Sequence, residues 1–181
     1  FRRVLFRSVG NFGQAVLRRA RGFGMELLGN DIVDIAPDFL LENGVEMTSL
    51  QDLLSRSDFI SINCDLNPTS QHLINAKTLS WVKPGAVLIN TARGPIIDQP
   101  ALVAALQQGR LGGAGMDVFE DEPLPADSPL LRMKNVLLSP HNTNSSPRFW
   151  ERVHWNTIKN LLIGLEIPTD RLAALKKEYG G

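Results

Sequence analysis

The chain has 181 residues, of which 43% are hydrophobic and 21% charged, a composition that excludes a disordered protein and suits one globular core. Lysine plus arginine and aspartate plus glutamate number 19 each, so the net charge is zero and a surface that grips nucleic acid is not expected. The single cysteine, Cys64, excludes an internal disulfide and a thiolate metal cluster, and no apolar run is long enough to span a membrane. We therefore expect a cytoplasmic protein that binds no metal and has neither nucleic acid nor a membrane as a partner.

The chain begins without an initiator methionine, and its first eight residues lack the apolar core of a signal peptide, so we expect a fragment of a longer protein. A first strand is predicted over residues 4–9. A helix then opens at Gly10 and ends near Gly22 or Gly24, because apolar residues recur four positions apart at Phe12, Val16 and Ala20.

A glycine turn, Gly10-Asn-Phe-Gly13, opens this helix, and Asp31 follows a second strand predicted over residues 25–29. In a dinucleotide-binding turn, glycines let the backbone approach the pyrophosphate at a helix N-terminus, and an acid about 20 residues further on binds the ribose hydroxyls. Ser8 stands where the first glycine of that fingerprint would be, so a plain tight turn is the alternative. Asp31 would repel a 2′-phosphate, which favours NAD over NADP.

The middle of the chain predicts further helices and a third strand. Thr48 and Gln51 fit a capping box ahead of a leucine-rich helix, and a strand follows over residues 59–63. Asn75 can cap a short helix that ends at Trp81.

The stretch over residues 85–98 is the most indicative of function. Its apolar half, residues 86–89, predicts a buried strand, after which the chain becomes polar at Asn90, Thr91 and Arg93. In an open α/β sheet, ligands bind beyond the carboxyl ends of the strands, so Arg93 is expected to face a ligand. A surface arginine in a salt bridge is the alternative.

The last third of the chain predicts a helix over residues 98–108, strands over 112–118 and 135–138, and a loop rich in proline and acid over 120–129. The longest helix is predicted over residues 147–164, with an apolar face formed by Trp150, Val153, Thr157, Leu161 and Leu165. Short apolar runs thus alternate with helical patterns, which is typical of βαβ units, so we predict an α/β fold with a parallel sheet.

Three residues with complementary chemistry follow predicted strands: Arg93, Glu122 and His141. The planar arginine fork binds a carboxylate in a bidentate way, and histidine exchanges a proton near neutral pH. A carboxylate beside the imidazole would stabilise the imidazolium and orient it, so the trio could do acid/base chemistry on an acid substrate. In the alternative, Glu122 is a solvated loop acid and His141 caps the last helix. His72 and His154 are expected to be structural.

Taken in order, several motifs resemble the signatures of the D-isomer-specific 2-hydroxyacid dehydrogenases. The motifs, which span about residues 9 to 165, are Gly10-Asn-Phe-Gly13, Asp31, Asn90-Thr-Ala-Arg-Gly94 with Asp98, Gly115-Met-Asp-Val-Phe-Glu-Asp-Glu-Pro123 and Ser139-Pro-His141. The family includes phosphoglycerate dehydrogenase, glyoxylate and hydroxypyruvate reductases, D-lactate dehydrogenase and the carboxy-terminal-binding-protein corepressors. The resemblance implies a Rossmann-type, doubly wound parallel sheet with flanking helices that binds NAD.

The resemblance also implies roles for individual residues. Arg93 would hold the substrate carboxylate, His141 would be the acid/base, and Glu122 would be the acid paired with it. Asp117 would face the nicotinamide end, and the loop over residues 64–70 would lie beside the adenosine half. The implied cofactor contacts are Gly10, Asn11, Phe12, Gly13, Asp31, Cys64, Asn67, Ser70, Thr91, Ala92, Arg93, Asp117 and His141.

Two departures from the family pattern concern the ends of the chain. Arg7 and Ser8 stand where the family has an apolar strand and a first glycine, which bears on pyrophosphate binding. The family also builds a substrate domain from both chain ends, and the amino-terminal part is absent here. We therefore predict an NAD-binding domain over residues 1–146, followed over residues 147–181 by a helix and tail that return to a mostly missing substrate domain.

Two functions are compatible with these residues. The first is an enzyme, expected to be a homodimer, that interconverts a D-2-hydroxy acid and its 2-oxo acid by hydride transfer with NAD; the fragment alone is expected to be inactive. The second is a dimeric scaffold of the corepressor type that senses NAD(H) without significant turnover. Both kinds of protein keep the three catalytic residue types, so the trio does not decide between them.

Overall fold

A computed structural model describes residues 3–168 and 172 of the chain. The chain divides into two compact units, Phe1–His141 and Asn142–Gly181. Apart from Leu172, the predicted tail over residues 169–181 lies outside the described residues. The assignment of the second unit to a substrate domain stays a prediction.

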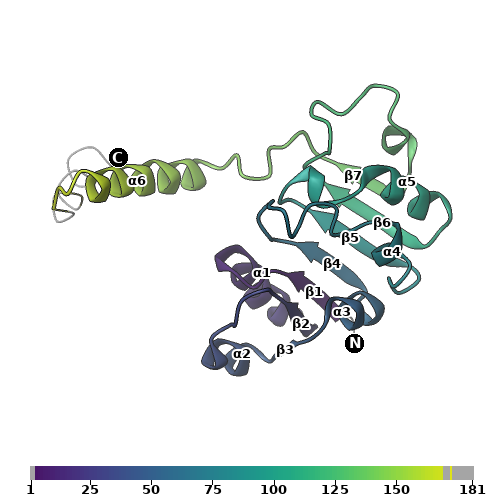
Figure 1. Cartoon of the computed structure of the whole chain (residues 1–181), viewed down its shortest axis with the longest axis horizontal. Helices are drawn as coiled ribbons and strands as arrows, with labels where there is room; N and C mark the ends of the chain where they lie inside the picture. Colours follow the sequence, from purple (N-terminus) through teal and green to yellow (C-terminus); the bar gives the residue numbers. More distant parts are fainter. Residues whose placement is uncertain (1–2, 169–171, 173–181) are drawn as a thin grey trace. The chain divides into compact units, whose positions relative to one another are not determined.

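The described part of the first unit is built on one parallel sheet of seven strands, in the order β3-β2-β1-β4-β5-β6-β7 (Figure 1). The chain runs outward from β1 to β3 and then returns past β1 to β4, so the strand order reverses between β1 and β4. The crevice at such a reversal is where doubly wound proteins bind ligands. The prediction of a Rossmann-type parallel sheet is confirmed. The strands are β1 (Arg3–Arg7), β2 (Glu26–Asn30), β3 (Val45–Met47), β4 (Phe59–Ile62), β5 (Ala86–Asn90), β6 (Leu111–Met116) and β7 (Val136–Leu138).

The helices of the first unit begin and end largely where the sequence signals predict. The side chains of Asn75 and Asp98 accept hydrogen bonds from first-turn N–H groups of the helices that follow them. The fifth helix stops just before Gly109, whose φ is +70°. The helices are α1 (Asn11–Gly22), α2 (Pro37–Asn43), α3 (Leu50–Arg56), α4 (Ala76–Leu79) and α5 (Gln99–Gln107), with single 3₁₀ turns at Gly94–Ile96 and Pro129–Arg132.

The start of α3 and the segment before it differ from the predictions. The cap of α3 lies one residue later than expected, because the Ser49 hydroxyl accepts a hydrogen bond from the Asp52 N–H and donates one to the Asp52 carboxylate. The sequence analysis predicted no element between the strand over residues 25–29 and the leucine-rich helix, where α2 and β3 form. The signals for α2 are Pro37 in its first turn and Gly44 at φ +64° after its end.

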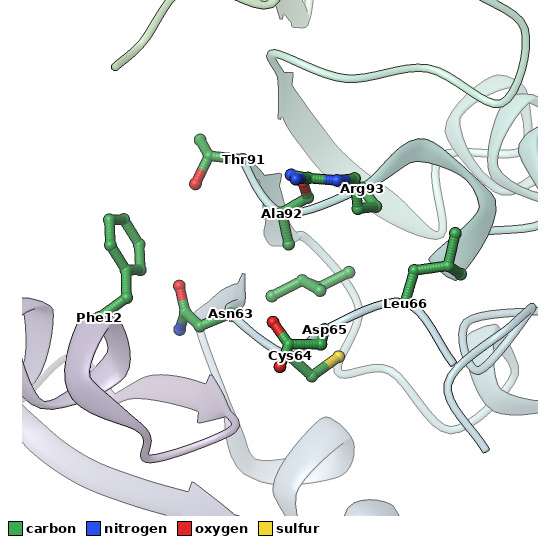
Figure 2. A pocket seen from close by; sticks show the side chains of 9 residues that line it. Phe12, Asn63, Cys64, Asp65, Leu66, Thr91, Ala92 and Arg93 are labelled. Carbon is green, nitrogen blue, oxygen red and sulfur yellow. The ribbon is translucent and has the colours of Figure 1, made fainter. Parts of the chain in front are cut away.

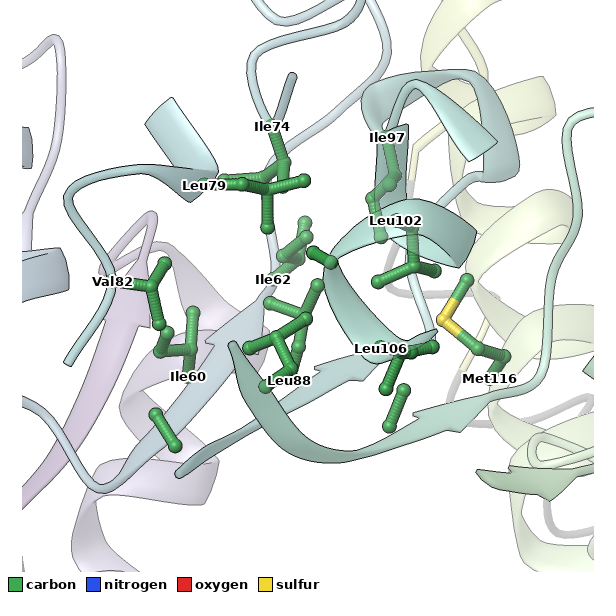
Figure 3. Packing of buried hydrophobic residues seen from close by; sticks show 14 of the residues in the cluster. Ile60, Ile62, Ile74, Leu79, Val82, Leu88, Ile97, Leu102, Leu106 and Met116 are labelled. Carbon is green, nitrogen blue, oxygen red and sulfur yellow. The ribbon is translucent and has the colours of Figure 1, made fainter. Parts of the chain in front are cut away.

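Two hydrophobic clusters cover the opposite faces of the sheet. The larger packs α3, α4 and α5 against β4, β5 and β6 (Figure 3). The smaller packs α1 and α2 against β2 and β3. Alternate residues of β4 divide between them, since Phe59 contacts the smaller cluster and Ile60 the larger. The buried face of α1 contains Leu17 and Ala20, whereas Phe12, predicted for that face, is 58% exposed.

The second unit contains α6 (Pro147–Gly164), which begins at the predicted residue because the Ser146 hydroxyl accepts a hydrogen bond from the Phe149 N–H. No residue of α6 is buried. The predicted apolar face is largely exposed, with Trp150 48% and Leu161 58% accessible. Within the described residues, no helix has both the length and the apolar character needed to cross a membrane.

Candidate active site

A cavity of about 300 Å³ lies where β4 and β5 end, facing the start of α1 (Figure 2). Phe12 stands on one side, the polar residues after β5 stand on the other, and the loop after β4 lies between them. The lining residues are Phe12, Ile62, Asn63, Cys64, Asp65, Leu66, Thr91, Ala92 and Arg93. The fold thus brings five of the predicted cofactor contacts to one cavity. Asp65 and Leu66 come from the loop over residues 64–70 that was expected beside the cofactor, whereas the sequence analysis did not single out Asn63.

The amino end of α1 is shaped for the close approach of an anion. Gly10 caps the helix without a side-chain hydrogen bond to the first-turn N–H groups. A Cβ atom on Gly13 would lie 2.2 Å from the Ser8 carbonyl oxygen, so this turn requires glycine at that position. Ser8 itself has φ +76°, a left-handed conformation that favours glycine and agrees with the missing fingerprint residue. The residues of this turn therefore fit a dinucleotide.

Asp31, directly after β2, accepts hydrogen bonds from the turn before α1. Its Oδ2 accepts hydrogen bonds from the Val9 N–H at 2.7 Å and the Ser8 hydroxyl at 3.1 Å, and its Oδ1 accepts one from the Ile32 N–H at 2.7 Å. Burial raises the pKa of Asp31, but these hydrogen bonds lower it more, so the pKa lies below its usual value. Asp31 is therefore an anion at neutral pH that also holds the turn in shape.

The loop after β4 is closed by Ser70. This residue is 1% exposed, and its hydroxyl donates a hydrogen bond to the Asp65 carbonyl at 2.6 Å and accepts one from the Asn67 N–H at 2.9 Å. The Asn67 side chain accepts a hydrogen bond from the Thr69 N–H at 2.8 Å. Neither Ser70 nor Asn67 lines the cavity, and their expected contacts with the cofactor stay predictions. Both shape the loop that presents Cys64.

Arg93 is positioned by Asn90, a fully buried residue at the end of β5. The Asn90 Nδ2 donates a hydrogen bond to the Arg93 carbonyl at 2.9 Å, and its Oδ1 accepts one from the Ala92 N–H at 3.0 Å. The Arg93 side chain is exposed, and its Nη1 donates to the Ala92 carbonyl at 2.6 Å. A guanidinium has several N–H donors, so others can bind an acidic ligand. The sequence gives a signal for this role of Asn90, because its amide ends a predicted buried strand three residues before Arg93.

Glu122 and His141 form a hydrogen-bonded pair. The Nδ1 of His141 lies 2.8 Å from one oxygen of Glu122, and the Phe119 N–H donates to the other oxygen at 2.9 Å. Burial raises the pKa of Glu122, but the hydrogen bonds from His141 and Phe119 lower it more, so the pKa lies below its usual value. The ionised carboxylate therefore keeps the proton of the imidazole on Nδ1 and leaves Nε2 for a reacting group.

This pair lines a second, more apolar cavity of about 330 Å³, formed by Phe119, Glu122, Pro123, Leu124, Leu131, Leu138, Ser139, Pro140 and His141. Arg93 lines the first cavity, and the next residue, Gly94, packs against Phe119, which lines the second. A Cβ atom on Gly94 would lie 1.7 Å from the Phe119 carbonyl oxygen, so the backbones are in direct contact. Asp117 is 3% exposed and lines neither cavity; its N–H donates to the Asn90 carbonyl at 3.0 Å. Its expected place beside the nicotinamide stays a prediction.

The other two histidines line neither cavity. The Nε2 of His72 lies 2.5 Å from an oxygen of Glu120, and the ring of His154 lies beside Trp150 with centroids 6.1 Å apart. Across the described residues, the His, Cys, Asp and Glu side chains form no group of three or more that could hold a metal ion.

Comparisons with known proteins agree with this geometry. A family model described as the D-isomer specific 2-hydroxyacid dehydrogenase, NAD binding domain, matches residues 2–143. A glyoxylate reductase from Korarchaeum cryptofilum is 44% identical over 155 residues, which make up 86% of this chain and 46% of that protein. The chain thus spans about half the length of the curated relatives it matches.

Two solved structures resemble the chain over most of its length. The holo form of D-mandelate dehydrogenase from Rhodotorula graminis has a TM-score of 0.83 and 34% identity, covering 89% of this chain and 47% of that one. A D-isomer specific 2-hydroxyacid dehydrogenase from Xanthobacter autotrophicus, in complex with NADPH and MES, has a TM-score of 0.80 and 32% identity, covering 92% and 68%.

Proposed function

Because the chain belongs to the D-isomer-specific 2-hydroxyacid dehydrogenase family, we propose that it supplies the cofactor half and the catalytic residues of an enzyme that interconverts a D-2-hydroxy acid and its 2-oxo acid. The matched region is the NAD-binding domain of that family, so the cofactor is NAD(H). The observation that carries the proposal is the Glu122–His141 pair at 2.8 Å, since the reaction needs a group that gives or takes one proton at the C2 oxygen.

The proposed mechanism assigns one task to each residue. When bound, NADH supplies the hydride that reaches C2 of the 2-oxo acid, and NAD⁺ accepts it in the reverse direction. Arg93 binds the substrate carboxylate with two parallel hydrogen bonds. His141 gives its Nε2 proton to the carbonyl oxygen during reduction and takes it back during oxidation. Glu122 stabilises the imidazolium and holds it in one orientation.

The cofactor-binding roles are proposals that rest on the turn and the first cavity. Gly10 and Gly13 let the α1 N-terminus approach the pyrophosphate, and Phe12 and the first cavity accept the rest of the dinucleotide. Asp31 binds the ribose hydroxyls and disfavours a 2′-phosphate, so we propose a preference for NAD(H) over NADP(H). The Xanthobacter autotrophicus relative was solved with NADPH, so the preference has to be tested for each member of the family.

We further propose that the enzyme acts as a homodimer in the cytoplasm. The exposed apolar residues of α6 support an association surface, because large side chains such as Trp150 and Leu161 gain stability when covered.

Turnover by the full-length protein tests the proposed function. Glyoxylate and hydroxypyruvate are the first substrates to try, because relatives are named glyoxylate reductase and glyoxylate/hydroxypyruvate reductase B. We expect loss of NADH absorbance with at least one 2-oxo acid of a panel. Tight NADH binding with no turnover on any 2-oxo acid would favour the dimeric NAD(H)-sensing scaffold instead.

A further inference from the structure

Glu120 stands two residues before Glu122 and belongs to a different ion pair. Its Oε1 lies 2.5 Å from the His72 Nε2, and its Oε2 accepts a hydrogen bond from the Gln99 N–H at 3.0 Å. The Glu120 N–H in turn donates to the Gln99 side chain at 3.4 Å. One side chain therefore joins three segments that are far apart in the sequence: the loop before α4, the start of α5 and the loop after β6.

The His72 end of this connection is itself fixed. The His72 N–H donates to the Pro95 carbonyl at 2.9 Å, and the His72 carbonyl accepts a hydrogen bond from the Asn75 side chain at 2.8 Å. Its φ of +47° is in the left-handed region, which a residue other than glycine adopts only when its surroundings hold it there. Next to it, Ile74 and Ile97 form a parallel bridge. His72 is therefore attached to the segment that follows Arg93.

The same segment touches the loop that carries Glu122. A Cβ atom on Gly94 would lie 1.7 Å from the Phe119 carbonyl oxygen and 2.5 Å from the Glu120 nitrogen. Arg93 directly precedes Gly94, and the Phe119 N–H holds the Glu122 carboxylate. A shift of the loop after β6 relative to Gly94 would therefore change the spacing between Arg93 and the Glu122–His141 pair.

We propose that His72 and Glu120 are positioning residues of the reaction. They clamp the loop after β6 onto the segment after β5, which fixes Glu122 and His141 relative to Arg93. This inference rests on the proposed function, because the spacing matters only if one substrate contacts Arg93 and His141 together. A displacement of about 1 Å in such an arrangement can lower the rate roughly 100-fold.

The alternative is a pair that contributes only to stability, as expected for the exposed ion pair between Arg56 and Glu46. The two roles differ in what they change. A stability pair alters the unfolding temperature and leaves kcat unchanged in the folded protein. A positioning pair alters kcat, and the size of this change depends on whether Glu122, the residue that it positions, is intact.

The test uses the full-length protein with Glu120→Ala, Glu120→Gln and His72→Gln, and with Glu46→Ala as the matched control. We expect Glu120→Ala to lower kcat for 2-oxo acid reduction roughly 10- to 100-fold, with NADH affinity and the control unchanged. Glu120→Gln should recover most of kcat, because its amide can accept from the Gln99 N–H and donate to the His72 ring. His72→Gln tests the other end if Glu120→Ala does not fold.

A double-mutant cycle with Glu122→Gln then separates positioning from independent damage. If Glu120 acts through Glu122, Glu120→Ala should cost much less kcat in the Glu122→Gln background than in the parent. Unchanged kcat in folded Glu120→Ala, or two effects that simply multiply, would overturn the inference.

A second readout does not depend on turnover. The NMR signals of the His141 ring should shift in Glu120→Ala, while those of the His154 ring stay unchanged, because His141 contacts the clamped loop through Glu122 and His154 does not. Unshifted His141 signals would overturn the clamp. Shifted His141 signals in a protein without turnover would support the clamp and overturn the proposed function.

Discussion

The Nδ1 of His141 lies 2.8 Å from Glu122, and the second oxygen of Glu122 is held by the Phe119 N–H. The carboxylate thus lies between a ring and a backbone group that both donate to it. This arrangement keeps Glu122 ionised and restricts the orientation of the ring, which is the preparation that general acid/base catalysis requires.

Glu122→Gln should shift the pH dependence of reduction. The pKa of Glu122 lies below its usual value of 4.5, so the carboxylate is ionised throughout about pH 5 to 9. Reduction uses the imidazolium, which the anion stabilises, so without the anion activity should be lost at a lower pH. The measurement is kcat/KM against pH, with Glu46→Gln as the control. An unmoved profile would remove Glu122 from the mechanism.

Arg93→Lys should raise KM strongly for the 2-oxo acid. A lysine supplies a point charge but not the planar fork that binds a carboxylate with two hydrogen bonds. If the same side chain aligns the keto group, kcat should also fall. Steady-state kinetics of Arg93→Lys and of Arg132→Lys, an exposed control, measure both effects. Parent-like kinetics in Arg93→Lys would mean that the substrate carboxylate binds elsewhere.

Calorimetric titration should show NADH binding more tightly than NADPH, by on the order of 100-fold. The reason is the charge of Asp31, whose pKa lies below its usual value and which would face a 2′-phosphate. Asp31→Asn keeps the size of the side chain and should narrow the difference, whereas Asp38→Asn in α2 should not. Equal affinity of the parent for both cofactors would contradict the role given to Asp31.

The chain on its own should self-associate. Helix α6 exposes Trp150, Leu161 and Ile163, Leu165 directly after it is also exposed, and exposed apolar surface of this kind drives association. Light scattering should show a dimer or larger species, and Leu161→Glu should shift it toward monomer. A monomer at high concentration of the parent chain would count against the prediction.

The fold was predictable from sequence because its signals are local. Buried strands, capping residues such as Asn75 and Asp98, and the stop at Gly109 each act within a few residues. The predictions that failed also depended on local signals. Helix α2 was missed because it is short and carries no long apolar pattern. Phe12 was assigned to the buried face because it matches the helical period, although it faces the cavity.

The candidate site was less accessible to sequence reasoning. Glu122 and His141 are 19 positions apart, so their pairing came from the family resemblance and not from spacing. The contact of Gly94 with Phe119 and the connection of Glu120 to His72 depend on how three loops meet. Ser70 illustrates the converse, because a polar residue in a loop beside the site turned out to be buried and bonded within its own loop.

The most direct test of the account is the activity of His141→Gln in the full-length protein, with His154→Gln as the matched control. If His141 is the proton carrier, the variant should bind NADH nearly as well as the parent while kcat for 2-oxo acid reduction falls roughly 10²- to 10⁴-fold. The control should keep parent-like kcat. A fully active His141→Gln would contradict the assignment of this site to a hydroxyacid dehydrogenase reaction.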